Sequence, residues 1–326
     1  MISVNKLLVI ITSVLLLTAC DKPESSKDDK GVSQAELNDF IKDIKANLVF
    51  VEGGDFEMGD FGGLIFGQQI DPDSDSKPLH KIELNGFSIS KLKITNKEYD
   101  FYLASKGLKR REVKKSLQKW YDDLNATPNT PAHIDWYEAE SYCNWLGEIT
   151  KKPFSLPTEA QWEYAARSRG KFLSVATNTG KAEVEHRIGG KDKGINIATS
   201  FDRESYSKKV KNILGSASSL PGDHFPPNPL GVYDMSANGY EWVKDWYDPD
   251  YYKNSPSKDP QGPTHPTYKY KNDGYQKVVR SSDRYNGIVG SVVDRSFRHP
   301  RITENDHFLG DMTARCVVNT PIIVND

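Results

Sequence analysis

Apolar residues at helical spacing, each run opened by a capping side chain, predict four helices along the chain. At each start a serine, threonine or aspartate stands three residues before a glutamate or glutamine, which is the pattern of a capping box. In the first run Leu37, Phe40 and Ile44 share one face and predict a short amphipathic helix over residues 33–47. The capping pairs are Ser33 with Glu36, Thr95 with Glu98, Asp135 with Glu138, and Thr158 with Gln161.

Between these helices the pattern changes to that of short strands. Residues 48–51 are apolar throughout and residues 81–89 alternate, so both segments predict strands. From residue 170 to 326, Gly, Pro, Asn and Asp recur at short intervals, and we predict loops and short strands without a long helix.

An acidic loop precedes the second strand region. Asp71, Asp73 and Asp75 alternate there as at the start of an EF-hand, but Ser76 stands where that motif needs its glycine. We therefore expect a solvated acidic loop.

The N-terminus has the pattern of an export signal. Lys6 precedes an uncharged run over residues 7–19, which is too short to span about 30 Å of hydrocarbon comfortably, and Cys20 follows it. Leu17 to Cys20 resembles a lipobox, whose cysteine carries a diacylglycerol after cleavage. The alternatives are an uncleaved anchor or an ordinary signal peptide with a chance cysteine. Asp21 resembles an inner-membrane retention signal, so we expect a bacterial lipoprotein that faces the periplasm, at the inner rather than the outer membrane.

These patterns divide the chain into a signal peptide (1–19), a flexible tether (20–32), a helix (33–47) and a domain (48–326). Cleavage removes one lysine and no acid, which takes the net charge from −2 to −3. So small a charge gives no electrostatic reason to expect nucleic-acid binding. The chain has 3 cysteines and 7 scattered histidines, which suggest neither a disulfide scaffold nor a zinc site.

Six segments, in order, resemble the formylglycine-generating-enzyme (sulfatase-modifying factor) family. The resemblance implies an α+β fold, irregular and loop-rich, related to the C-type lectins, with few short helices and short antiparallel strands. Five tryptophans are then expected in the core, and Glu159 and Glu163 are expected to be capped, solvated or ion-paired rather than catalytic. The matching segments are F-V-E-G-G-D-F-E-M-G (50–59), I-T-N-K-E-Y-D-F-Y (94–102), T-P-A-H-I-D-W-Y-E-A-E-S-Y-C-N-W-L-G (130–147), L-P-T-E-A-Q-W-E-Y-A-A-R (156–167), F-P-P-N-P-L-G-V-Y-D-M-S-A-N-G-Y-E-W-V-K-D-W-Y (225–247) and K-V-V-R (277–280), with a degraded A-R-C-V (314–317) at the end.

The family's copper chemistry lacks its ligands here. The resemblance implies two cysteine thiolates beyond a V-R-G-G-S strand, because soft sulfur selects Cu(I). No cysteine lies between Cys143 and Cys316, and Asn286 or Ser291 would offer only hard oxygen. Related sulfoxide synthases use iron held by three histidines, whose spacing this chain lacks. We therefore expect neither copper nor iron, and no catalytic residue is assigned.

Two further expectations follow from the resemblance. The family partners of Cys143 and Cys316 are absent, so both thiols are expected to be buried and unpaired. Calcium is possible at the loop that matches G-N-x-W-E-W, through the carbonyls of Ser236, Ala237 and Gly239 and the carboxylate of Glu241.

The remodelled catalytic side could bind a partner protein. Ser281 and Ser282 replace the family's glycine pair, which indicates a rebuilt pocket. One hypothesis is a membrane-anchored binding module with a periplasmic protein partner, such as an immunity protein against an envelope-targeting toxin or a part of a secretion or assembly complex. The other is an enzyme of the same superfamily with cysteine-independent maturation chemistry. The expected partner or pocket face comprises Arg280, Ser281, Ser282, Asp283, Arg284, Arg295, Arg298 and Arg315.

Overall fold

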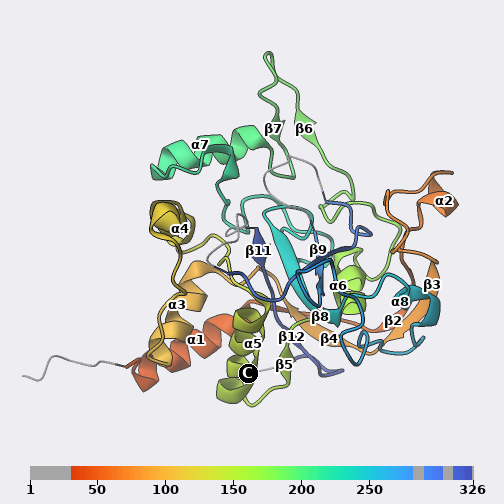
Figure 1. Cartoon of the computed structure of the whole chain (residues 1–326), viewed down its shortest axis with the longest axis horizontal. Helices are drawn as coiled ribbons and strands as arrows, with labels where there is room; N and C mark the ends of the chain where they lie inside the picture. Colours follow the sequence, from red (N-terminus) through yellow and green to blue (C-terminus); the bar gives the residue numbers. More distant parts are fainter. Residues whose placement is uncertain (1–30, 282–289, 304–310, 325–326) are drawn as a thin grey trace, which may run out of the picture. The chain divides into compact units, whose positions relative to one another are not determined.

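Two small sheets of four strands each carry the fold (Figure 1). The computed structural model describes residues 31–281, 290–303 and 311–324. One sheet is antiparallel throughout and has the order β1 (Leu48–Val51), β4 (Phe87–Ser90), β12 (Val317–Val318), β5 (Phe154–Ser155). It brings the first strand and the last described strand of the domain into one layer.

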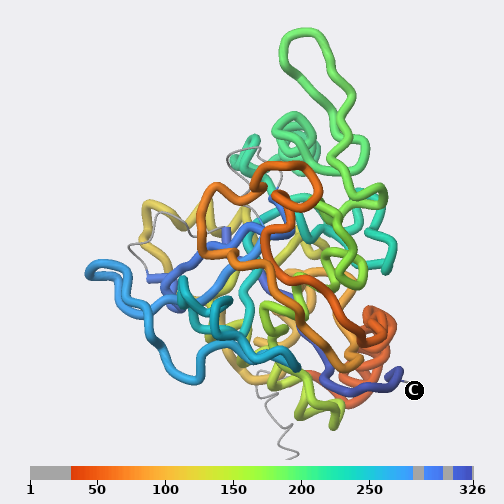
Figure 2. Tube along the Cα trace, turned by 90° about the vertical axis from the view of Figure 1, so that its right-hand side faces the viewer, coloured from red at the N-terminus to blue at the C-terminus, as the bar shows by residue number. Residues whose placement is uncertain are grey.

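The second sheet has the order β10 (Ser296–Arg298), β9 (Lys277–Arg280), β8 (Tyr240–Trp246), β11 (Met312–Thr313). Its β10–β9 and β9–β8 pairs are antiparallel, as expected, and the short β11 runs parallel to β8. Two hairpins lie outside the sheets: β2 (Gly54–Met58) with β3 (His80–Leu84), and β6 (Val184–Glu185) with β7 (Lys193–Gly194). The β6–β7 hairpin projects from the domain in two perpendicular views (Figures 1 and 2).

The four predicted capping boxes open helices, with the reciprocal side-chain and backbone contacts in place. Four helices were not predicted, namely α2, α4, α7 and α8. Of these, α7 corrects the expectation that no long helix follows residue 170. The helices of the described part of the chain are α1 (Gln34–Ala46), α2 (Gly62–Ile65), α3 (Asn96–Ser105), α4 (Gln118–Asn125), α5 (Trp136–Thr150), α6 (Glu159–Ala166), α7 (Ser200–Val210) and α8 (Tyr251–Asn254).

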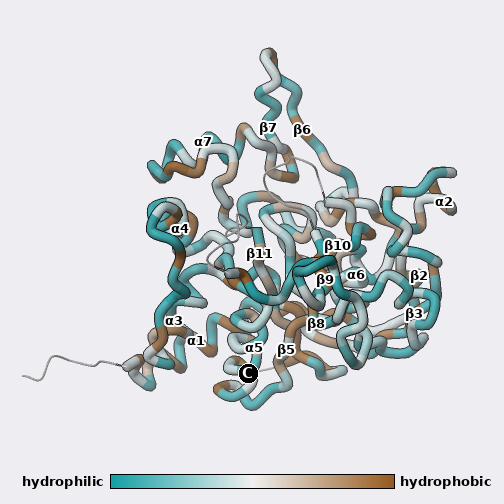
Figure 3. The backbone as a smooth tube through the Cα atoms, viewed as in Figure 1, coloured by the Kyte–Doolittle hydropathy of each residue, from teal (hydrophilic) through white to brown (hydrophobic). Residues whose placement is uncertain are grey.

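The apolar core surrounds the two sheets. In Figure 3 brown, apolar stretches of the chain lie near the labels of β5 and β8. Trp136, Trp145, Trp162 and Trp242 are buried as expected, and Trp246 is half-buried. Across the described ranges no helix has both the length and the apolar character needed to cross a membrane.

The aspartate loop differs from the solvated loop that was expected. Asp71 and Asp75 are buried, and only Asp73 is exposed. Tyr247 donates a hydrogen bond to Asp75 at 2.6 Å, and the Asp60 carboxylate accepts the backbone N–H groups of Ile70 and Asp71. These carboxylates organise the loop from within, because each accepts donors that would otherwise be unsatisfied.

Candidate functional site

Two residues of the expected partner or pocket face, Arg280 and Arg295, belong to a buried network of arginines and glutamates. Arg280, on β9, donates to Glu159 at 2.7 Å and to Glu163 at 2.9 Å. Arg295 makes two hydrogen bonds to Glu159, at 2.7 and 3.1 Å. Glu163 also accepts from Arg167 at 2.8 Å. Glu159 and Glu163 are thus ion-paired, which confirms one of the alternatives expected for them.

The two glutamates of the network come from one helix, α6, whereas Arg280 and Arg295 come from distant parts of the chain. Glu159 and Glu163 lie four residues apart on α6, so both carboxylates project from one face of the helix. Burial would raise the pKa of the Glu159 carboxyl, but Arg295 and Arg280 together hold it below its usual value. Burial, and then the neighbouring Glu159 carboxylate, raise the pKa of Asp245 to about 7.

A second buried cluster occupies the predicted calcium loop. The Lys93 ammonium donates to the carbonyls of Ala237 at 2.6 Å and Gly239 at 2.8 Å, and lies 3.8 Å from a Glu241 oxygen. Arg315 binds both Glu241 oxygens, at 2.6 and 2.9 Å. A charged group of the chain itself therefore lies against three of the four predicted ligands.

The fourth predicted ligand also has a partner, because the Ser236 carbonyl accepts the N–H of Gly290 at 3.0 Å. The four predicted calcium ligands thus already have partners in this structure. A calcium ion would have to displace the Lys93 ammonium, because two positive charges at this distance repel each other. A chelation test of the melting temperature decides whether calcium binds here. Sequence reasoning missed Lys93, although a lysine between Leu92 and Ile94 was a signal that could have found it.

Four residues of the expected partner or pocket face do not reach the surface. Arg280, Ser281, Arg295 and Arg315 are all buried. Their side chains hold the interior together and cannot contact a partner without disruption of the fold. Ser282, Asp283 and Arg284 lie outside the described residues, and Arg298 is half-buried at the wall of an open cavity.

The expectation of unpaired thiols is also wrong. Cys143, on α5, forms a disulfide with Cys316, which directly precedes β12, and both residues are buried. Their Cα atoms lie 5.7 Å apart although 173 residues separate them in the chain. This proximity could not be inferred from the sequence because it depends on how β12 docks beside α5. Cys20 lies outside the described residues.

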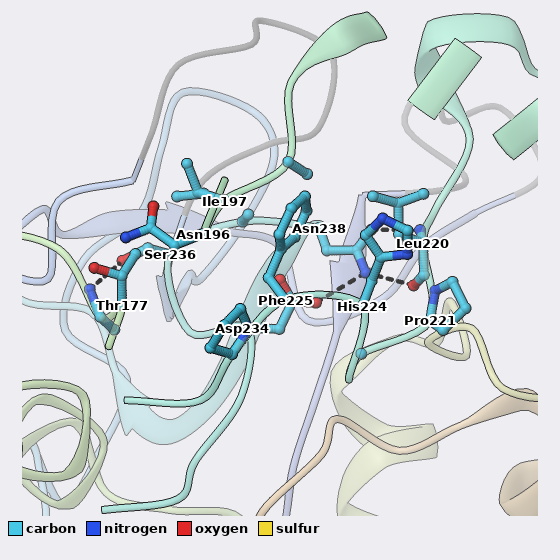
Figure 4. A pocket seen from close by; sticks show the side chains of 15 residues that line it. Thr177, Asn196, Ile197, Leu220, Pro221, His224, Phe225, Asp234, Ser236 and Asn238 are labelled. Carbon is cyan, nitrogen blue, oxygen red and sulfur yellow. Dashed lines mark hydrogen bonds between the residues drawn. The ribbon is translucent and has the colours of Figure 1, made fainter. Parts of the chain in front are cut away.

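A narrow cavity lies beside the Lys93 cluster (Figure 4). Its volume of about 20 Å³ has room for roughly one water molecule. The Asn238 side chain lines the cavity. It donates hydrogen bonds to the Leu220 carbonyl and the Asp234 carboxylate and accepts one from Arg203. Burial raises the pKa of Asp234 to about 6. The size of the cavity makes it a hydration site in the wall of the fold rather than a substrate pocket.

Residues 33–302 match the family described as Sulfatase-modifying factor enzyme 1-like domain. This match covers most of the chain, and together with the mixed helix and strand fold it shows that the chain belongs to the family. The resemblance noted on the sequence motifs is therefore confirmed at the level of family and fold.

Among known proteins, the formylglycine-generating enzyme of Streptomyces coelicolor is 27% identical over 66% of this chain and 74% of its own length. The serine/threonine-protein kinase pkn1 of Chlamydia pneumoniae is 28% identical over 76% of this chain. The match covers only 36% of that kinase, so this chain spans about a third of the relative's length.

Solved structures agree on the fold. PvdO from Pseudomonas aeruginosa is 25% identical, with a TM-score of 0.56 over 83% of this chain and 93% of that chain. Treponema denticola variable protein 1, at 17% identity, has a TM-score of 0.52 over 84% of this chain and 95% of that chain, and it supports the fold alone.

Proposed function

We propose that this chain is a lipid-anchored envelope protein whose sulfatase-modifying-factor domain binds a partner protein instead of oxidising a cysteine. The observation that carries this proposal is the Cys143–Cys316 disulfide. The chain has 3 cysteines, and the third is Cys20, the proposed lipidation site. The domain therefore keeps no thiolate pair with which to hold copper.

The remains of the family's catalytic side support the same proposal. Arg280 and Arg295 belong to the segment that resembles the family's catalytic region. In the interior, Arg280 is ion-paired with Glu159 and Glu163, and Arg295 is ion-paired with Glu159. A guanidinium that is ion-paired with a buried carboxylate is poorly placed to bind substrate. If it moved to a substrate, the carboxylate would remain buried without a partner, which is energetically costly. These residues act as a scaffold here.

The proposed location is the bacterial envelope, anchored through Cys20 and facing the periplasm, with the inner membrane favoured. The disulfide supports an oxidising compartment, since such bonds persist in the periplasm and are rare in the cytosol. Immunity against an envelope-targeting toxin and membership of a secretion or assembly complex are the two roles that fit an anchored binding domain.

An enzyme with cysteine-independent maturation chemistry is the alternative. Its support is the likeness to the formylglycine-generating enzyme of Streptomyces coelicolor. Function, however, depends on the site rather than on the fold.

The anchor is tested by labelling cells with a radioactive fatty acid. The wild-type chain should incorporate label and stay with membranes, and Cys20→Ser should do neither. An unlabelled wild-type chain would remove the anchor from the proposal.

The binding role is tested with the full-length chain in its own membranes. Chemical cross-linking should yield a discrete complex with the same second protein in repeated purifications. Incubation of the purified chain with copper and a cysteine-containing sulfatase peptide should yield no aldehyde. Aldehyde formation would overturn the proposal, and modification of a recovered protein without a stable complex would favour the alternative enzyme.

A further inference from the structure

An open cavity with a volume of about 420 Å³ lies at the end of β10. Figure 3 shows β10 beside β9 near the centre of the domain. Volumes of this order hold a short peptide segment or a small organic molecule. The cavity is lined by Trp242, Tyr270, Asp273, Gln276, Phe297, Arg298, His299, Arg301, Ile302 and Met312.

Arg298 differs from the buried arginines in its partners. Its guanidinium donates to the Phe297 carbonyl at 2.8 Å and to the Ser296 hydroxyl at 3.3 Å, and lies 4.9 Å from the centre of the Tyr240 ring. Among the residues that the structure describes, none of these contacts is to a carboxylate. The charge of Arg298 is thus held in place and not neutralised.

A second cationic group, Arg301, lies nearby and makes a long ion pair with Asp135. The Arg301 guanidinium stands over the Tyr137 ring at 4.3 Å and is 4.0 Å from Asp135, too far for a hydrogen bond. Its side chain is 62% exposed. The one acid of the cavity wall, Asp273, accepts a hydrogen bond from Gln276 at 3.3 Å. Of the two guanidiniums on this wall, Arg298 is thus the one that contacts no carboxylate among the described residues.

Apart from Gln276 and His299, the remaining wall is aromatic or aliphatic. Trp242 is fully buried behind this wall, where its N–H donates to the Ile134 carbonyl at 3.0 Å. The ring of Phe297 packs against the rings of Tyr270 and Tyr247, with ring centres 5.1 and 4.6 Å apart, and these contacts fix its position. Rigid aromatic walls bind an apolar side chain with little loss of conformational entropy.

We propose that this cavity binds a segment of the partner protein in which an aromatic or aliphatic side chain adjoins a carboxylate. The apolar side chain packs against Phe297 and Tyr270, and the carboxylate pairs with Arg298, with Arg301 at the rim. A planar guanidinium without a carboxylate partner is suited to such an anion because it can donate two parallel hydrogen bonds. This proposal rests on the proposed binding function and names the chemistry that the partner presents.

The test uses two blocked dipeptides, acetyl-Phe-Glu-amide and acetyl-Phe-Gln-amide, which differ only in charge. Their binding to the isotope-labelled, purified chain is followed by NMR chemical shifts. We expect the Glu peptide to shift residues of the cavity wall and to bind about tenfold more tightly than the Gln peptide, since its carboxylate forms charge-assisted bonds. Added salt should reduce this difference.

Variants separate the cavity from general surface charge. Arg298→Gln should remove the preference for the Glu peptide and keep residual binding of the phenyl group, whereas Arg298→Lys should restore part of it. The control is Arg187→Gln, an exposed arginine on the β6–β7 hairpin that pairs with Glu185 at 2.9 Å and should leave both affinities unchanged. Unchanged amide spectra elsewhere would show that each variant is folded.

Three results would overturn the proposal: no saturable shift with the Glu peptide, equal affinity for the two peptides, or an unchanged preference in Arg298→Gln. The proposed function is tested apart from it. A complex in membranes that forms equally with wild type and Arg298→Gln keeps the binding role and rejects this cavity. The absence of any complex alongside saturable Glu-peptide binding rejects the partner and keeps the site.

Discussion

At the scale of single residues, charges that a sequence would assign to the surface lie in the interior. Lys93, Arg280, Arg295 and Arg315 are almost completely buried, and each has a carboxylate or carbonyl partner from a distant part of the chain. A buried ion pair gives little net stability compared with apolar packing, but removal of one partner strands the other. Single substitutions in these clusters should therefore have large effects.

Lys93→Met should destabilise the domain by about 3 kcal/mol, because the Ala237 and Gly239 carbonyls lose their donor and Glu241 loses a neighbouring charge. Urea unfolding measures this loss. In the wild type, a chelator should leave the melting temperature unchanged, since the ammonium already occupies the loop. A clear drop with chelator would reinstate calcium at Glu241.

Arg295→Ala should cost about 3 to 5 kcal/mol because it leaves the Glu159 carboxylate partly unpaired in the interior. Arg169→Ala is the matched control. Arg169 pairs with Glu52 at 2.8 Å, but the two side chains are 42% and 72% exposed, so its loss should cost less than about 1 kcal/mol. Equal effects of the two substitutions would show that the Glu159 network contributes no more than a surface pair.

At the scale of elements, the disulfide joins α5 to the start of β12 and so closes most of the domain into one loop. The capping boxes determine where α1, α3, α5 and α6 begin, but the docking of these helices depends on long-range contacts of this kind. The long loop restricts the unfolded chain more than a short one would.

Cys143→Ala and Cys316→Ala should each lower the free energy of unfolding by up to about 5 kcal/mol, in the chain-entropy account of a loop closed across 173 residues. The double variant should resemble either single one, because the same cross-link is lost. Denatured wild type kept free of reductant should show no reactive thiol from these two residues. Two free thiols under those conditions would contradict the pairing.

At the scale of the whole molecule, three carboxyls that are buried or half-buried have raised pKa values. Burial is the main cause that raises the pKa of Asp234 to about 6 and the pKa values of Asp245 and Asp294 to about 7. Each group then binds its proton more tightly in the folded state than in the unfolded state. Their contribution to stability is present at low pH and is lost as pH rises through these folded values.

Stability should therefore increase as pH falls from 8 to about 5, by up to about 1.4 kcal/mol per pH unit for each group below its folded pKa. The gain should end at lower pH, where Glu159 and Glu241, whose pKa values are lowered by their arginine partners, become protonated. Urea unfolding across this range measures the slope. Asp245→Asn should make the slope between pH 5 and pH 7 less steep, because the contribution of this carboxyl is lost. An unchanged slope would show that Asp245 does not contribute to the pH dependence of stability.

The sequence by itself determined the family, the α+β class and the starts of four helices. A capping box can be predicted because both of its hydrogen bonds form within four residues of chain. The same reasoning missed α7, whose box closes with Asp202 in place of a glutamate and whose residues Ser200–Val210 show no apolar stripe. Local rules thus identify an element only where its signals lie close together and follow the common pattern.

Tertiary structure alone decided which charges are buried and which side chains meet. Arg280 finds Glu159 across 121 residues, and Cys143 finds Cys316 across 173. The sequence placed Arg280 and Arg298 on one face, yet the first lies in the interior and the second on a cavity wall. The physical reason is that the energy of a charge depends on its solvation and its neighbours, and both are set by segments far away in the chain.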